Sequence, residues 1–186
     1  MSKAKNKKRK HIEVVAAAVV HDGFVLAVQR GKGKYVYTEH KWEFPGGKME
    51  QGESEEAALR RELREEMNYE VVPQERLLTV THSYPDFDIT LHVWICSPAD
   101  DAENFELKEH ASSAWLRPDE LGDPDWCAAD ERVVEALKAR YGQSEKVAEE
   151  VAPAGEEQSG GPTNKELWLV LALVVVMTVL YFVQRR

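Results

Sequence analysis

The first clear hydrophobic run of the chain is residues 12–20, whose sequence IEVVAAAVV favours a buried β-strand. Asp22 and Gly23 follow this run and form a typical two-residue turn signal. The apolar run FVLAV at 24–28 can then return beside the first strand. We therefore expect the folded part of the chain to open with an antiparallel hairpin.

Three later segments also have the pattern of strands, and a fourth has that of a helix. The strands are expected at 77–82, 88–96 and 113–116, and the helix at 130–138. Asp130 is a residue type that caps helices, so this helix should begin there. Together with another helix in the first half of the chain, these elements predict strands with a helix on each side, which is an α/β sandwich.

A regular amphipathic helix is predicted from Ser54 onwards. Ser54 can cap its start, and the acidic residues that follow suit the first turn because they face the positive end of the helix dipole. Residues 57–66 contain neither glycine nor proline and favour a helix. The apolar side chains fall close to one face, at Ala58, Leu59, Leu63 and Met67.

Three carboxylates project from one side of this helix. Glu62, Glu65 and Glu66 stand at i, i+3 and i+4, so their side chains emerge together within about one turn. Carboxylates at this spacing repel one another, and a bound cation would relieve the repulsion. Oxygen ligands of this kind suit Mg²⁺, or Mn²⁺, better than zinc. A solvated surface helix rich in Glu and Arg would show the same carboxylates, so a metal site needs further support.

The loop before the helix adds features that a plain surface helix lacks. Gly46 and Gly47 let the backbone approach a metal ion or a phosphate closely. Arg61 lies next to the carboxylates and can hold Glu53 from the loop in a charge-assisted pair. Mg²⁺ is commonly bound by protein carboxylates and substrate phosphates together. The glycine loop, Arg61 and the carboxylates therefore indicate a site that acts on a diphosphate.

At these positions the chain resembles a known family. The residues that match the Nudix box, a signature of enzymes that cleave nucleoside diphosphates linked to another group, are Gly47, Glu53, Arg61, Glu62, Leu63, Glu65 and Glu66. Asn68 stands where the family usually has a glycine in the left-handed conformation, and asparagine is the next-best residue for it. The resemblance implies a Nudix α/β/α sandwich with a mixed sheet, in which Gly47, Glu53 and Arg61 are structural.

Outside the box, residues 12–140 look most like the MutT branch, which hydrolyses nucleoside triphosphates to monophosphates and pyrophosphate. The sequence EFPGGK at 43–48 matches the loop before its box. The resemblance implies that Mg²⁺, with Mn²⁺ as the alternative, is held by the Gly46 carbonyl, Glu62, Glu65, Glu66 and Glu109. Glu65 or Glu109 would be the general base. Substrate contacts would come from Arg30, Glu43, Phe44, Lys48, Phe87 and Asp130.

The base of the substrate stays open at this stage. Phe87 stands where a branch member that reads oxidised guanine has arginine, and Asp130 stands where that member has asparagine, although aspartate occurs in pyrimidine-directed relatives. An 8-oxo-dGTP-type substrate, a CTP or methyl-dCTP type, and an RNA 5′ end all fit the box. Arg30 and Glu109 are equally compatible with solvated surface positions. A non-catalytic nucleotide sensor or scaffold is the alternative from another class, and the complete box argues against it.

The composition changes sharply along a chain whose net charge is −9. Residues 1–11 form a basic arm, which could contact RNA or anionic lipid or could serve solubility alone. Residues 12–140 have the composition of one globular domain, and 141–166 predict a disordered acidic linker. An apolar segment at 167–183 and a short basic tail at 184–186 follow. No obligate protein partner is evident.

The segment at 167–183, LWLVLALVVVMTVLYFV, predicts one C-terminal transmembrane helix. At about 1.5 Å per residue it can just cross a thin bilayer core. Trp168 and Tyr181 lie near its ends, where interfacial aromatic residues are favoured. The positive-inside rule would draw Arg185 and Arg186 to the cytoplasmic side. Nothing resembling an export signal precedes the domain, however, so we expect a cytoplasmic catalytic domain tethered to a membrane.

Overall fold

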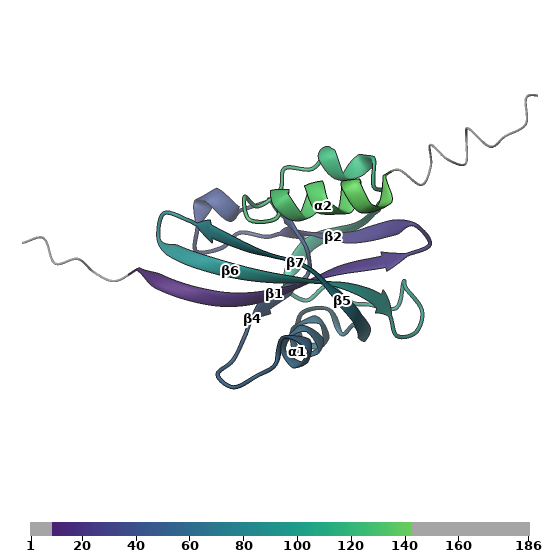
Figure 1. Cartoon of the computed structure of the whole chain (residues 1–186), viewed down its shortest axis with the longest axis horizontal. Coiled ribbons are helices and arrows are strands. Elements are labelled where there is room, and N and C mark those ends of the chain that lie inside the picture. Colours follow the sequence, from purple (N-terminus) through teal and green to yellow (C-terminus); the bar gives the residue numbers. More distant parts are fainter. Residues whose placement is uncertain (1–8, 143–186) are drawn as a thin grey trace, which may run out of the picture. The chain divides into compact units, whose positions relative to one another are not determined.

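The structure is a computed structural model, and it describes residues 9–142 (Figure 1). Most of the predicted basic arm, nearly all of the linker, the apolar segment at 167–183 and the tail lie outside the described residues. Within the described part of the chain, no helix is both long enough and apolar enough to span a membrane. The membrane segment therefore stays a prediction.

The described residues form one sheet and two α-helices. The strands are β1 (Lys10–His21), β2 (Phe24–Arg30), β3 (Trp42–Glu43), β4 (Gly46–Lys48), β5 (Val71–Ser83), β6 (Phe87–Pro98) and β7 (His110–Leu116). The helices are α1 (Glu55–Met67) and α2 (Glu131–Tyr141), and short 3-10 helices lie at Val36–Thr38 and Glu120–Gly122.

β1 is the central strand of the sheet. The strands are hydrogen-bonded in the order β3–β2–β1–β6–β5, with β4 also paired to β1 and β7 to β2. β1 runs parallel to β6, with residues 10–19 beside residues 87–96, and the other strand pairs are antiparallel. The mixed sheet implied by the Nudix resemblance is confirmed.

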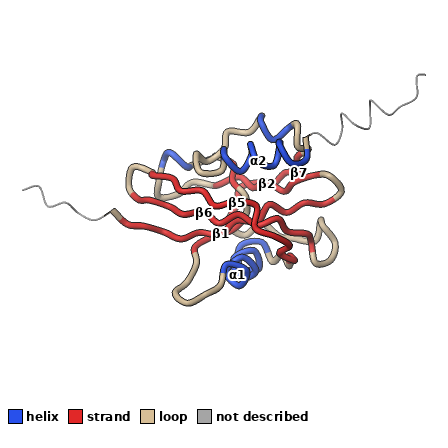
Figure 2. The backbone as a smooth tube through the Cα atoms, viewed as in Figure 1, coloured by secondary structure: helices blue, strands red, loops and turns tan. Residues whose placement is uncertain are grey.

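Each face of the sheet is covered by one helix (Figure 2). Successive residues of β1 point to opposite faces, and both faces of this strand are apolar. The core on one face joins β1 to α1 through Val15, Ala17, Val19, Leu59, Leu63 and Met67. The core on the other face joins β1 to α2 through Ala16, Ala18, Val133, Val134 and Leu137. The predicted α/β/α sandwich is confirmed for the described residues.

Both ends of α1 form as the sequence predicts. The hydroxyl oxygen of Ser54 accepts a hydrogen bond from the Ala57 N–H at 3.2 Å, which satisfies one free donor of the first turn. At the other end Asn68 is left-handed, with φ 49° and ψ 37°. Its N–H donates to the Arg64 carbonyl at 3.0 Å and so ends the helix.

The strands differ from the prediction mainly in length. The first hairpin turns at Asp22 and Gly23 as expected, with φ of 48° and 84°. β5 begins at Val71, six residues before the predicted start, because register shifts at Pro73/Glu75 and Arg76/Leu78 interrupt the alternation that marks a strand. β3 and β4 are only two and three residues long and have no sequence pattern of their own.

Candidate active site

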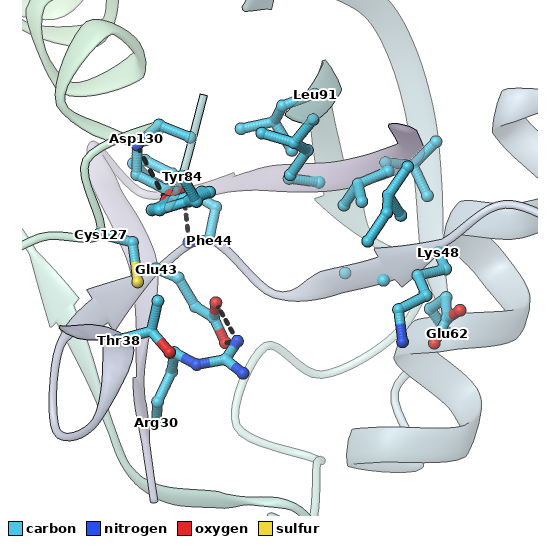
Figure 3. Close-up of a pocket in the computed structure, with 18 of the residues that line it drawn as sticks. Arg30, Thr38, Glu43, Phe44, Lys48, Glu62, Tyr84, Leu91, Cys127 and Asp130 are labelled. Atoms are coloured by element: carbon cyan, nitrogen blue, oxygen red, sulfur yellow. Dashed lines mark hydrogen bonds and ion pairs between the residues drawn. The ribbon is translucent and has the colours of Figure 1, made fainter. Parts of the chain in front are cut away.

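A cavity of about 490 Å³ is lined by residues of β1, β2, β4, β6 and α1. It brings together all the residues that the sequence predicts to contact the substrate, namely Arg30, Glu43, Phe44, Lys48, Phe87 and Asp130. Among the predicted metal ligands, Gly46, Glu62, Glu66 and Glu109 also line it. In Figure 3, Asp130, Phe44 and Cys127 lie toward one end of this pocket, and Lys48 and Glu62 lie toward the other.

The two glycines of the loop allow close approaches of different kinds. A Cβ added to Gly46, whose φ is 152°, would lie 2.2 Å from the Val15 carbonyl oxygen, so glycine is needed for β4 to pair with β1. A Cβ added to Gly47 would lie 2.4 Å from the Cδ and Oε2 atoms of Glu62. Gly47 therefore provides the space in which the Glu62 carboxylate sits against the backbone of β4.

This difference predicts separable effects of two alanine substitutions. Gly47→Ala should displace the flexible end of Glu62, so we expect activity to fall about tenfold or more while the melting temperature changes little. Gly46→Ala forces a backbone clash and should lower the melting temperature strongly. Thermal unfolding and turnover of the two variants check this. Equal losses of stability would contradict the assignment of Gly47 to the carboxylate.

Arg61 organises the acids of the box. Its guanidinium donates to both oxygens of Glu53 at 2.9 Å, and to Glu62 at 2.9 Å. A further bond, of 3.0 Å, reaches the carbonyl of Lys48 and so ties α1 to β4. Glu65, by contrast, contacts Arg61 at 3.2 Å on a side chain that is 60 % exposed, and it does not line the pocket.

Glu66 is the carboxylate whose environment most requires a cation. Its Oε2 atom is buried and has no hydrogen-bond partner within the described part of the chain. Burial raises the pKa of Glu66 to about 8, and the nearby charges of Glu62, Glu109 and Glu43 act in the same direction. A divalent ion would supply the missing partner and cancel this repulsion, so these residues fit such an ion.

The carboxylates are not already gathered around one point. Between residues 9 and 142, no three His, Cys, Asp or Glu side chains are arranged as a ready-made metal site. Arg61 holds two of the proposed ligands, Glu62 and Glu65, in ion pairs. Binding of an ion by these groups therefore requires a redistribution of their contacts.

The raised pKa of Glu66 predicts how metal and pH act together on stability. The folded protein holds this proton up to about pH 8, whereas an unfolded glutamate loses it near its ordinary value of 4.5. The metal-free protein should therefore lose stability as pH rises between these values, because the folded state binds more protons. Mg²⁺ or Mn²⁺ should raise the melting temperature more at pH 8 than at pH 5. Thermal unfolding with and without metal, with Glu66→Gln as control, measures both effects.

Arg30 and Glu43 form an ion pair at the pocket wall. Nη1 of Arg30 donates to the two oxygens of Glu43 at 2.8 and 2.6 Å. The Glu43 side chain is 17 % exposed, whereas that of Arg30 is 41 % exposed. The remaining guanidinium donors of Arg30 are thus available to an anionic group of a substrate, in an orientation that Glu43 fixes.

Asp130 does not act as the helix cap that its position predicts. Its backbone is helical rather than extended, and its side chain makes no capping hydrogen bond to α2. Oδ1 instead accepts a hydrogen bond from the Phe44 N–H at 3.1 Å, across the floor of the pocket. The residue is 6 % exposed, and burial raises the pKa of its carboxyl group well above the ordinary value. Tertiary contacts therefore draw this side chain away from the helix end and into the cavity.

Comparison with known protein families now identifies the fold. The family model of the NUDIX domain matches residues 10–137 of the chain. The chain belongs to the Nudix family. It is an enzyme of the MutT-like kind, a Nudix pyrophosphohydrolase, and enzymes of this family generally use divalent metals such as Mg²⁺.

Two curated relatives show which Nudix enzymes it is similar to. The chain is 35 % identical over 130 residues to the CTP pyrophosphohydrolase of Escherichia coli, covering 70 % of this chain and 93 % of that protein. It is 38 % identical over 90 residues to the 8-oxo-dGTP diphosphatase of Proteus vulgaris, covering 48 % of this chain and 78 % of that protein.

Solved Nudix structures have the same fold. The solution structure of the E. coli ORF135 protein is 32 % identical, with a TM-score of 0.59, over 79 % of this chain and 96 % of that one. The solution structure of a MutT Nudix hydrolase from methicillin-resistant Staphylococcus aureus is 34 % identical, with a TM-score of 0.56, over 71 % of this chain and 98 % of that one.

Sequence reasoning missed several residues of this Nudix pocket. They are Lys10, Ile12, Lys34, Tyr35, Thr38, Tyr84, Ile89, Leu91 and Cys127. Phe87 packs against Tyr35 and Tyr84, each at 5.1 Å between ring centroids, and so lines the pocket as part of an aromatic group. The aromatic residues around the turn before β6 could have suggested Tyr84. The others line the pocket through strand pairing and loop placement, which no local pattern reveals.

Proposed function

We propose that this Nudix hydrolase converts a cytosine-bearing nucleoside triphosphate, of the CTP or methyl-dCTP type, to the monophosphate and pyrophosphate with Mg²⁺. The single observation that carries the proposal that a side chain reads the base is the buried acid Asp130 in the pocket. The similarity to an enzyme named CTP pyrophosphohydrolase, over most of both chains, supports the same assignment.

The argument from Asp130 concerns its protonation. Burial raises the pKa of Asp130 and so favours the neutral acid over the carboxylate, and a carboxylic acid presents one donor and one acceptor side by side. The Watson–Crick edge of cytosine presents the complementary pair, the N3 acceptor and the N4 amine donor. Oδ1 already accepts the Phe44 N–H, which fixes the plane of the carboxyl group. The acid and the base edge can therefore form two parallel hydrogen bonds.

The carboxylates of α1 together with Glu109 would do the chemistry. Glu62, Glu66 and Glu109, with Glu65 and the Gly46 carbonyl, would hold the divalent ion. When bound, this ion supplies charge neutralisation on the phosphate oxygens and makes an attacking water more acidic. Glu65 or Glu109 takes the proton of that water as general base. Arg30 binds a phosphate oxygen, because Glu43 orients its guanidinium toward the pocket.

Substitution of Asp130 tests the base assignment. Asp130→Asn offers the same donor and acceptor as the neutral acid, so we expect it to keep the preference among bases. Asp130→Leu removes both, and kcat/KM for the preferred base should fall about ten- to a hundredfold. The measurement is pyrophosphate release with Mg²⁺ from CTP, dCTP, methyl-dCTP, 8-oxo-dGTP and the ordinary triphosphates. Loss of the preference in Asp130→Asn would show that an ionised carboxylate reads the base.

The same set of nucleotides tests the second candidate substrate, 8-oxo-dGTP. The O6 acceptor and N7–H donor of the oxidised purine can also pair with a neutral acid, and a relative bears the name 8-oxo-dGTP diphosphatase. A higher kcat/KM for 8-oxo-dGTP than for all cytosine nucleotides would replace our assignment. Binding of nucleotides without any release of pyrophosphate or phosphate would instead favour the non-catalytic sensor.

We further propose that the enzyme acts at a membrane, tethered through residues 167–183. The support is the apolar composition of that segment. Fractionation of cells that express the full chain should place it with membranes, and a chain that ends at residue 142 should be released.

A separate deletion tests the basic arm. Removal of residues 2–8 should weaken binding to RNA or to anionic vesicles if the arm contacts either.

A further inference from the structure

His110, the first residue of β7, is enclosed between two carboxylates beside the pocket. Its side chain is 6 % exposed, and its Nε2 lies 3.4 Å from Glu43 Oε1 and 3.9 Å from Glu66 Oε2. Its Nδ1 is buried and has no hydrogen-bond partner within residues 9–142. Two acids, one from β3 and one from α1, thus lie within 4 Å of Nε2.

The two acids have different tasks. Glu43 is held by Arg30, whose Nη1 donates to both of its oxygens. Glu66 has a buried oxygen that makes no hydrogen bond within residues 9–142, and it belongs to the proposed metal ligands. Both side chains are only 17 % exposed, so water screens their charges poorly and the two carboxylates repel each other. A polar group between the two carboxylates would reduce this repulsion, so that Glu43 stays paired with Arg30 and Glu66 stays near the metal site.

We propose that His110 is a positioning residue that keeps Glu43 on Arg30 and leaves Glu66 free to bind the divalent metal. The inference rests on the proposed function, since it takes Glu66 as a metal ligand. The imidazole places its Nε2 within 4 Å of both carboxylates. With an apolar residue there, the ionised form of Glu66, which binds the metal, would face the Glu43 carboxylate with no donor between them, and this form would be disfavoured.

The inference predicts the metal affinity of His110 variants. Electron paramagnetic resonance of Mn²⁺ with the full chain, without nucleotide, measures the dissociation constant directly. His110→Leu keeps bulk but has no donor, so the constant should rise about tenfold or more, as when groups behind metal ligands are removed. His110→Gln can place an amide N–H near the position of Nε2, so it should stay within about threefold of the unsubstituted protein.

A second substitution separates positioning from packing. In the His110→Leu background, Glu43→Gln makes the facing group neutral, so Glu43 no longer repels Glu66 and most of the lost Mn²⁺ affinity should return. A purely structural role of His110 predicts no recovery, because the second change fills no space. His110→Asn, whose shorter amide does not reach the Nε2 position, replaces the leucine variant if that one fails to fold, and it should lose affinity in the same way.

Turnover measurements test the role of His110 independently of Mn²⁺ binding. For His110→Leu, kcat at low Mg²⁺ should fall and should recover as Mg²⁺ saturates, while KM for the nucleotide stays within about twofold. Unchanged Mn²⁺ affinity in His110→Leu, or no recovery in the double variant, overturns the proposal. If Mn²⁺ binding follows the expected pattern but no nucleoside triphosphate is cleaved, the positioning role stands and the proposed function fails.

Discussion

Replacing Glu66 with glutamine should remove most turnover and yet stabilise the metal-free protein. The amide keeps the shape of the side chain but lacks the charge that the ion needs, so we expect kcat to fall about a hundred- to a thousandfold. The same change removes a buried charge that Glu62, Glu109 and Glu43 repel, so the melting temperature without metal at pH 8 should rise. Steady-state kinetics and thermal unfolding on one preparation measure both effects.

The matched control for this substitution is Glu56→Gln on the same helix. Glu56 is exposed in the first turn of α1, so its loss should leave kcat unchanged and reduce stability only slightly. A Glu66→Gln enzyme that turns over like the unsubstituted one would exclude Glu66 from the reaction. A lower melting temperature in that variant, measured without metal, would show that the repulsion at this site is weaker than its burial implies.

Replacing Arg61 with glutamine should cost both stability and activity. Three acids contact its guanidinium, and two of them, Glu53 and Glu62, have side chains only 15 % and 12 % exposed. Removal of one partner leaves carboxylates unpaired in a poorly solvated place. Because the Arg61 side chain is 24 % exposed, water offsets part of the loss, and we expect the free energy of unfolding to fall by about 2–3 kcal/mol. Urea unfolding measures the change.

Arg64→Gln is the control that separates Arg61 from arginines in general. Arg64 lies on the same helix and pairs with Glu70, but the two side chains are 55 % and 48 % exposed, so this substitution should destabilise the protein much less than Arg61→Gln. The double variant Arg61→Gln with Glu53→Gln should recover part of the stability, since it removes one unpaired charge. If Arg61→Gln were no more destabilising than Arg64→Gln, the box arginine would have no structural role.

The parts of the fold that the sequence predicts are those set by nearby residues. α1 begins at Ser54 and ends at the left-handed Asn68 because the capping groups lie within one turn of the backbone that they satisfy. The first hairpin follows from its turn residues in the same way. β5 was predicted too short because its bulges break the alternation, and β3 and β4 exist only through pairing with distant strands.

In the site, too, features set by nearby residues are predictable and features set by distant contacts are not. The carboxylates of α1 are predictable from helical spacing alone, and the Arg61–Glu53 contact follows from the box. The sequence predicts that Asp130 caps α2. In the structure the N–H of Phe44, 86 residues away in the chain, donates a hydrogen bond to its side-chain oxygen instead. His110 escaped notice because only the pairing of β7 with β2 brings it beside Arg30 and Glu43. Contacts between distant segments therefore decide what these side chains do.

The parallel pairing of β1 with β6 has a consequence for how the protein is made. β1 leaves the ribosome before the other strands of the described sheet and forms its centre, yet its longest partner, residues 87–96, is synthesised 77 residues later. Until then, β1 can pair only with β2 and β4, through short registers at its end and its middle. Non-local pairing of this kind slows folding and leaves apolar strand surface uncovered meanwhile. We expect the nascent chain to stay protease-sensitive, and to need chaperone protection, until β6 has emerged.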